Sequence, residues 1–114
     1  MFDIFILNSL GKLKQRFPHA CEIKDLSLYD ATCWAARNSS TELFWVLSDK
    51  VDYENFDFSY EPAWHQRDHM HVWPSNNQTL GGETLLVNRR EWLNQKPNNL
   101  LDYQPLTQHS EKLK

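Results

Sequence analysis

The sequence is poor in the residues that mark several specialised classes of protein. Its 114 residues contain only two cysteines, three glycines and five prolines. Cys21 and Cys33 stand apart and outside any C-x-x-C group, which excludes a disulfide scaffold and a cysteine-rich zinc site, and we expect both to be reduced and buried. The scarcity of glycine and proline excludes a collagen-like or low-complexity chain.

Long hydrophobic runs and an excess of basic residues are also missing. The apolar run at residues 2–7 contains Asp3 and has no basic leader, so it predicts neither a membrane span nor an export signal. The net charge of −3 gives no long-range attraction to phosphate backbones, and we expect neither nucleic acid nor membrane as a partner. We interpret the basic residues Lys12, Lys14 and Arg16 as the solvated face of a helix.

Aromatic residues, by contrast, are abundant, with five Trp, six Phe and four Tyr. A chain of this length can bury roughly two-thirds of its unfolded surface in one core. We therefore predict one folded domain over residues 1–95, followed by a C-terminal tail over residues 96–114.

Apolar segments predict alternating strands and helices. The expected strands cover residues 2–7, 19–23, 42–47, 70–73 and 83–88, the last after a Gly81-Gly82 turn. The expected helices are one with Leu10, Leu13 and Phe17 on a single face, one at residues 28–38 and a short one at residues 89–95. Ser9 and Ser27 are the predicted N-caps of the first two helices.

The order of these segments favours one fold class. Because strands that alternate with helices form parallel crossovers, the fold class is α/β, a single three-layer domain with a mixed, largely parallel sheet. We expect residues 2–7 to form a central strand, and the closely spaced later strands to pair antiparallel.

Polar residues follow three of the predicted strands at the points where the strands end. They are Asn8 and Ser9 after the first, Asp25 after the second, and Ser48, Asp49 and Lys50 after the third. Ligands of open α/β sheets bind beyond the carboxyl ends of the strands. These residues are therefore candidate ligand contacts, and ordinary capping and turn positions are the alternative.

Two further clusters suggest metal chemistry. Carboxylates at Asp49, Asp52, Glu54 and Asp57 could hold Mn²⁺ or Mg²⁺ against a diphosphate, with a solvated acidic loop as the alternative. Three histidines, His65, His69 and His71, lie within seven residues. They form a weak zinc pattern, for which structural or surface histidines are the favoured interpretation; His71 could instead line the cleft in its neutral form.

Several short segments occur in a characteristic order. They are Phe2-Asp3-Ile4-Phe5, a helix ending in Leu-Lys-Gln-Arg-Phe-Pro, Thr41-Glu42-Leu43-Phe44-Trp45-Val46, Phe56-Asp57-Phe58, His71-Val72-Trp73 and a Gly-Gly strand. This order resembles the small glycosyltransferase-like proteins and domains of tailed bacteriophages. Those proteins in turn resemble the nucleotide-binding half of GT-A-type, nucleotide-sugar-dependent transferases. The resemblance covers residues 2–93.

The resemblance implies a truncated GT-A or Rossmann-like fold and a bound nucleotide or nucleotide sugar. It also implies a phage-encoded protein in the host cytoplasm or the virion. Such relatives have an Asp-x-Asp motif after the Phe-Trp-Val strand, and here only Asp49 stands for one of its carboxylates, as the metal ligand. Asn8, Ser9 and Asp25 would then face base and ribose, and Ser48, Asp49 and Lys50 the diphosphate.

The resemblance assigns no catalytic base, so whether the chain is an active transferase stays open. The alternative is a non-enzymatic viral protein that uses the same fold to bind a host factor, a small nucleotide or virion subunits. A single exposed patch formed by Tyr53, Tyr60, Trp64 and Trp92 would favour that alternative.

Overall fold

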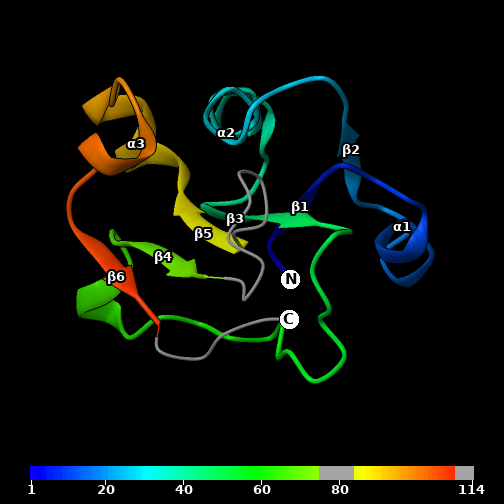
Figure 1. Ribbon diagram of the computed structural model, residues 1–114. Coiled ribbons are helices and arrows are strands. Elements are labelled where there is room, and N and C mark those ends of the chain that lie inside the picture. The colour runs from blue at the N-terminus through cyan, green and yellow to red at the C-terminus, as the bar shows by residue number, and fades with distance from the viewer. Residues whose placement is uncertain (75–83, 110–114) are drawn as a thin grey trace.

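The computed structural model describes residues 1–74 and 84–109, which form six strands, three α-helices and two 3-10 turns (Figure 1). The strands are β1 (Asp3–Leu7), β2 (Cys21–Ile23), β3 (Leu43–Ser48), β4 (Met70–Trp73), β5 (Thr84–Asn88) and β6 (Leu106–Gln108). The helices are α1 (Lys12–Arg16), α2 (Leu28–Asn38) and α3 (Arg89–Gln95), and the turns are η1 (Trp64–Gln66) and η2 (Leu100–Asp102).

The six strands form one mixed sheet in the order β2-β1-β3-β5-β4-β6. β1 runs parallel to both of its neighbours, with Phe5 opposite Cys21 of β2 and Val46 of β3. β5 pairs antiparallel with β3 and β4, and β6 is parallel to β4. The other five strands therefore run in one direction, and β5 alone runs against them. The predicted α/β class with a mixed, mostly parallel sheet is confirmed.

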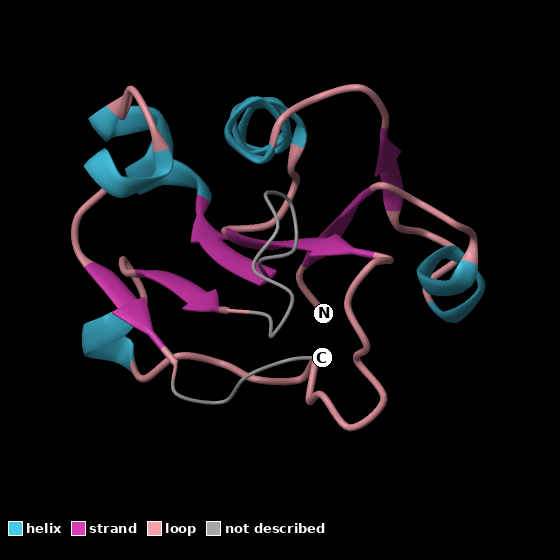
Figure 2. Cartoon of the chain, viewed as in Figure 1, coloured by secondary structure: helices cyan, strands magenta, loops and turns pink. Residues whose placement is uncertain are grey.

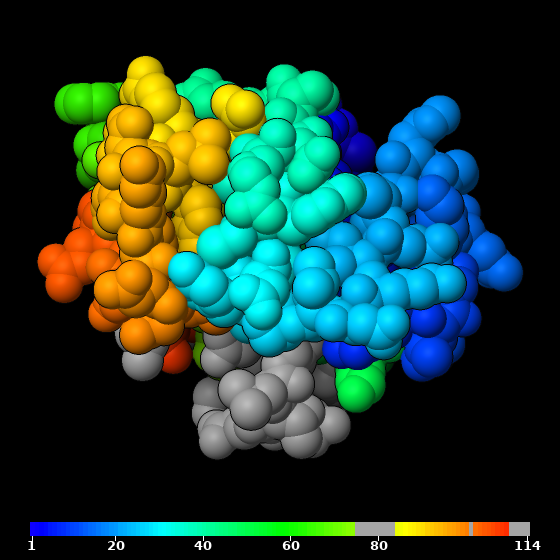
Figure 3. All heavy atoms as spheres, turned by 90° about the horizontal axis from the view of Figure 1, so that it is seen from above, coloured from blue at the N-terminus to red at the C-terminus, as the bar shows by residue number. Residues whose placement is uncertain are grey.

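Helices and a long connection cover the two faces of the sheet (Figure 2). On one face, Ala31 and Ala35 of α2 and Trp92 of α3 pack in a shared core against the sheet. The side chains of these two helices lie side by side over that face when the molecule is seen from above (Figure 3). On the other face, Leu13 of α1 packs with residues of the connection between β3 and η1. The sheet is thus the middle of three layers.

β3 is buried along its whole length because both of its faces are covered. On the α1 face, the Trp45 ring packs edge-on against Phe56 and Phe58, with ring centroids 5.6 Å away in each case. Trp73 of β4 completes this aromatic cluster at 5.4 Å from Trp45. Aromatic packing, rather than regular secondary structure, therefore holds the connection after β3 against the sheet.

Most elements agree with the sequence predictions. β1 is the expected central strand, α3 has the expected bounds, and the Ser27 hydroxyl accepts a hydrogen bond from the Asp30 backbone N–H at the start of α2. The predicted Gly81-Gly82 turn lies outside the described residues. The two cysteines are free and only half-buried, which corrects the expectation that both are buried.

The prediction of Ser9 as the cap of the first helix is wrong. Gly11 occupies the N-cap position with a φ of 92°, and α1 is only five residues long. Ser9 instead donates a hydrogen bond to the carboxylate of Glu22. Leu10 lies before the start of α1 and is 70% exposed, so it does not share a buried helical face with Leu13.

Part of the predicted tail belongs to the sheet. β6 adds to the edge of β4, with Met70 opposite Leu106. The Tyr103 side chain is fully buried, stacks on Trp92 and donates a hydrogen bond to the backbone carbonyl of Asp68. The residues that follow α3 therefore contribute to the core as well as to the sheet.

Candidate functional site

The order of the strands creates a crevice at one edge of the sheet. From β1 the chain crosses one face through α1 to β2, then returns over the other face through α2 to β3, on the opposite side of β1. Open α/β sheets bind ligands at such a switch point, outside the carboxyl ends of the strands. Here the switch point lies between β1 and β3.

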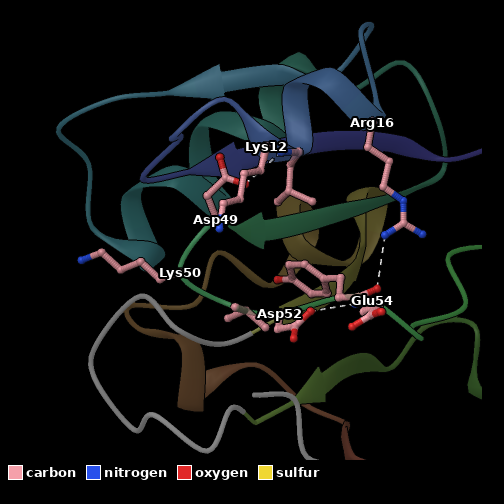
Figure 4. A pocket seen from close by; sticks show the side chains of 9 residues that line it. Lys12, Arg16, Asp49, Lys50, Asp52 and Glu54 are labelled. Atoms are coloured by element: carbon pink, nitrogen blue, oxygen red, sulfur yellow. Dashed lines mark hydrogen bonds between the residues drawn. The ribbon is translucent and has the colours of Figure 1, made fainter.

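A hollow of about 560 Å³ lies beside α1, directly after the end of β3 (Figure 4). Its lining residues are Lys12, Leu13, Arg16, Asp49, Lys50, Val51, Asp52, Tyr53 and Glu54. The position of the hollow matches the edge of the sheet at which parallel strands place their ligands.

Asp49 connects α1 to the end of β3. Its side chain is buried, and its two carboxylate oxygens accept hydrogen bonds from the backbone N–H groups of Leu10 at 2.6 Å and Leu13 at 2.9 Å. These N–H groups belong to the approach and first turn of α1, where backbone donors have no partner within the helix. Asp49 thus caps α1 from across the crevice and joins it to the end of β3.

Tyr53 forms part of the floor of the hollow. Its phenol oxygen accepts a hydrogen bond from the Ser48 backbone N–H at 3.1 Å and lies 2.7 Å from the hydroxyl oxygen of Thr84. Burial raises the pKa of Tyr53 to about 12, against weaker opposing effects of these two hydrogen bonds. The phenol therefore stays protonated at neutral pH and fixes the connection after β3 to β3 and β5.

The rims of the hollow carry opposite charges. Lys12 and Arg16 extend from α1, and Asp52 and Glu54 lie across from them on the connection after β3 (Figure 4). The guanidinium of Arg16 donates to the backbone carbonyl of Tyr53 at 3.2 Å. A ligand in this hollow would meet cations on the helix side and carboxylates on the loop side.

The structure brings some of the predicted site residues together and not others. Asp49 and Lys50 line the hollow, whereas Ser48 is buried and does not line it; the Ser48 hydroxyl accepts a hydrogen bond from the Lys50 backbone N–H at 3.2 Å. The other three, Asn8, Ser9 and Asp25, are not among its lining residues.

Asn8 and Asp25 occupy tight turns after their strands. They are exposed, with φ values of 51° and 61°. Asn and Asp tolerate this left-handed backbone better than most residues, which is the turn role expected as the alternative. Contact of these two residues, or of Ser9, with base and ribose stays a prediction.

Sequence reasoning missed Lys12, Arg16 and Tyr53 as site residues. The two basic residues are four positions apart, which places them on the same side of α1. This spacing could have indicated a shared ligand. Basic residues at such positions are equally expected on an exposed helix surface that binds nothing. The position of Tyr53 depends on the path of the connection after β3, and no local pattern indicates that path.

The histidines lie away from the hollow. His71 is buried, with Nε2 2.9 Å from the carbonyl oxygen of Gln66 and Nδ1 3.0 Å from Nε2 of His109. Burial lowers the pKa of His71, the hydrogen bond to the Gln66 carbonyl opposes this effect, and the nearby His109 and His69 add to it. Because a carbonyl only accepts, Nε2 of His71 carries a proton in this arrangement, and the lowered pKa favours the neutral form of this buried side chain.

The aromatic patch considered for a protein partner does not form. Tyr53 and Trp92 are buried and Tyr60 is half-buried, whereas Trp64 is 87% exposed. Over residues 1–74 and 84–109, no group of three or more His, Cys, Asp or Glu side chains is placed to hold a metal ion. None of the helices in the same residues has the length and apolar character needed to span a membrane.

Comparison with known proteins gives no match among family models, curated proteins or solved structures.

Proposed function

We propose that this chain binds a nucleotide or nucleotide sugar in the hollow between α1 and the end of β3. The observation that carries the proposal is that Asp49 and Lys50, which follow β3 at the switch point between β1 and β3, line this hollow. The mixed charges of its lining suit a ligand with both anionic phosphates and hydroxyl groups. Hydroxyl groups of a sugar would find acceptors in the carboxylates of Asp52 and Glu54.

The proposal extends to the resemblance seen in the sequence. We propose a truncated GT-A-like protein encoded by a phage and acting in the host cytoplasm or the virion. Asp49 occupies the place of the Asp-x-Asp motif, and each of its oxygens has one further acceptor position beyond its hydrogen bond to α1. Mn²⁺ or Mg²⁺ beside Asp49 is part of the proposal, whereas transfer of a sugar is not, because no residue is assigned as the base.

Thermal unfolding with a panel of ligands tests the proposal. The panel contains nucleosides, nucleoside diphosphates and nucleotide sugars, each with Mn²⁺ and with a chelator. A ligand at 100 times its dissociation constant stabilises the protein by about 2.7 kcal/mol, or roughly 10 °C in the unfolding midpoint of a domain this small. A midpoint that no member of the panel raises would contradict the proposed function.

The variant Asp49→Asn separates the contribution of the metal. If Mn²⁺ bridges Asp49 and the diphosphate, the ligand-dependent rise shrinks both in the chelator and in this variant. A rise that survives both conditions would remove the metal and Asp49 from the site while leaving nucleotide binding in place.

A further inference from the structure

Arg16 is held in place at the rim of the hollow. One of its terminal nitrogens donates to the Tyr53 carbonyl oxygen at 3.2 Å. Its guanidinium carbon also lies 5.2 Å from the ring centre of Phe17 and 5.0 Å from that of Phe58. A guanidinium that already packs on two neighbouring rings and donates to a carbonyl has little further freedom to lose when a ligand binds.

This fixed cation lacks a carboxylate partner in the described part of the chain. The ion pairs found there are Arg67 with Glu42, His69 with Asp68 and Arg90 with Glu91. Arg16 donates to a neutral carbonyl, so its charge is not balanced by that contact. The remaining N–H groups of its planar fork are free to match two oxygens of a phosphate.

Lys12 contributes a second positive charge to the lining of the hollow. It lies one helical turn before Arg16 and lines the same hollow. Like charges four residues apart destabilise a helix slightly, and an anion that contacted both would relieve that repulsion. No ion pair of Lys12 occurs within residues 1–74 and 84–109 either.

Among the charged residues of the hollow, those of α1 are the ones placed to bind an anion. Asp52 and Glu54 line the opposite rim and would repel phosphate. The Lys50 side chain extends away from Lys12 and Arg16 in the close view (Figure 4). The sequence placed Lys50 at the diphosphate, but the positive charges available to an anion in this hollow come from α1.

We infer that Lys12 and Arg16 form an anion subsite that binds the diphosphate directly through side-chain cations. This inference rests on the proposed function for the identity of the ligand. It places the diphosphate at α1 instead of at Ser48, Asp49 and Lys50, which lie at the end of β3.

Binding of inorganic pyrophosphate and of nucleoside diphosphates, measured by calorimetry in a chelator, tests the subsite. We compare the unchanged chain with Lys12→Gln, Arg16→Gln and the double variant. Lys24→Gln is the matched control, because it removes one exposed positive charge after β2 and outside the hollow. We expect each single substitution to weaken pyrophosphate binding at least tenfold, and Lys24→Gln to weaken it less than twofold.

Arg16→Lys separates charge from shape. It keeps the positive charge and loses the planar fork, so we expect binding between that of the unchanged chain and that of Arg16→Gln. Circular dichroism of each variant without ligand establishes that it is folded. Should Arg16→Gln not fold, Lys12→Gln and Arg16→Lys carry the comparison.

The outcomes distinguish the subsite from the nucleotide. Nucleoside diphosphates that bind the unchanged chain and the double variant equally well would overturn the subsite and leave the proposed function standing. If the double variant loses pyrophosphate binding and no nucleotide binds the unchanged chain better than pyrophosphate does, the result would support the subsite and contradict nucleotide binding. Failure of pyrophosphate to bind the unchanged chain in the chelator would overturn the subsite.

Discussion

Asp49 has a structural role at the site that is separate from any contact with a ligand. Its carboxylate accepts two backbone hydrogen bonds from the start of α1, and the Leu13 N–H that it satisfies is buried. Leaving a buried donor without a partner costs about 1–3 kcal/mol. A loss of binding in an Asp49 variant must therefore be separated from a loss of stability.

We predict that Asp49→Ala lowers the free energy of unfolding by about 1–3 kcal/mol without ligand. Asp49→Asn retains one acceptor oxygen and should lose less. Urea unfolding measures both, with Glu54→Ala as the control, since the exposed Glu54 side chain should change stability by no more than about 0.5 kcal/mol. Equal stability of Asp49→Ala and the unchanged chain would contradict the capping role.

Tyr53 supports the floor of the hollow through its hydroxyl group. We predict that Tyr53→Phe lowers the free energy of unfolding by about 1–2 kcal/mol, because the Ser48 N–H and the Thr84 hydroxyl lose their shared partner. Tyr60→Phe is the matched control, since Tyr60 is only half-buried and has its contacts through the ring. If both substitutions cost the same, the hydrogen bonds of Tyr53 contribute nothing particular to stability.

The sequence predicted residue roles best where a local pattern decides them. Ser27 caps α2 because a short hydroxyl side chain before a helix reaches the N–H of the third helical residue. Ser9 satisfied the same local pattern, yet its hydroxyl bonds to Glu22 from a neighbouring strand while the distant Asp49 caps α1. Contacts between residues far apart in the chain decided the outcome at this position.

At the scale of elements, a pair of histidines links β4 to the residue that follows β6. His71 of β4 shares a hydrogen bond with His109, and the His109 ring stacks on Trp73 at 4.0 Å. His69 lies beside His71 with its ring 6.1 Å away and its Nδ1 2.6 Å from the Thr107 hydroxyl. Uptake of a proton by each member of the His71–His109 pair would place two charges face to face.

This geometry predicts a stability that depends on pH. Because the pKa of His71 is lower in the folded chain than its ordinary value of 6.5, the unfolded chain takes up a proton first as the pH falls. The free energy of unfolding should therefore be constant above about pH 7 and decrease below about pH 6.5. Urea unfolding between pH 5 and 8 measures this profile.

The variant His71→Gln identifies the group responsible. We expect a flatter profile for this variant and an unchanged one for His65→Gln, which removes an exposed histidine. A His71→Gln profile as steep as that of the unchanged chain would assign the pH dependence to other groups.

The segment after α3 is a second element whose role the sequence understated. We predict that a chain ending at residue 95 loses at least about 3 kcal/mol, because it lacks both β6 and the buried Tyr103 ring. Tyr103→Phe removes only the hydrogen bond to Asp68 and should cost about 1 kcal/mol. A chain of residues 1–95 with the unfolding midpoint of the full chain would show that residues 1–95 fold independently.

At the scale of the whole molecule, the sequence predicted the layers and most of the strands. The apolar runs of β1 and β3 indicated buried central strands, and the spacing of their connections indicated parallel crossovers. The addition of β6 to the sheet was not predictable, because a three-residue exposed strand has no apolar periodicity. The layer formed by the connection after β3 likewise follows from aromatic contacts across the sheet and not from a helical or strand pattern.

The same division applies to the site. The rule of strand ends placed Asp49 and Lys50 correctly at the hollow, because their positions depend only on the direction and order of the strands. It did not locate Lys12 and Arg16, which lie on the opposite side of the hollow. Their positions depend on contacts between distant parts of the chain: Asp49 accepts a hydrogen bond from the Leu13 N–H of α1, and the Tyr53 carbonyl accepts one from Arg16.

The most direct test of the central claim is to map where a nucleotide binds. A titration of the ¹⁵N-labelled chain with the nucleoside diphosphate that stabilises it most, followed by amide chemical shifts, reports each backbone position. The proposed site predicts the largest changes at α1 and at residues 49–54, with little change along β4 and β6. Changes centred on β4 and β6, or no changes at saturating nucleotide, would contradict it.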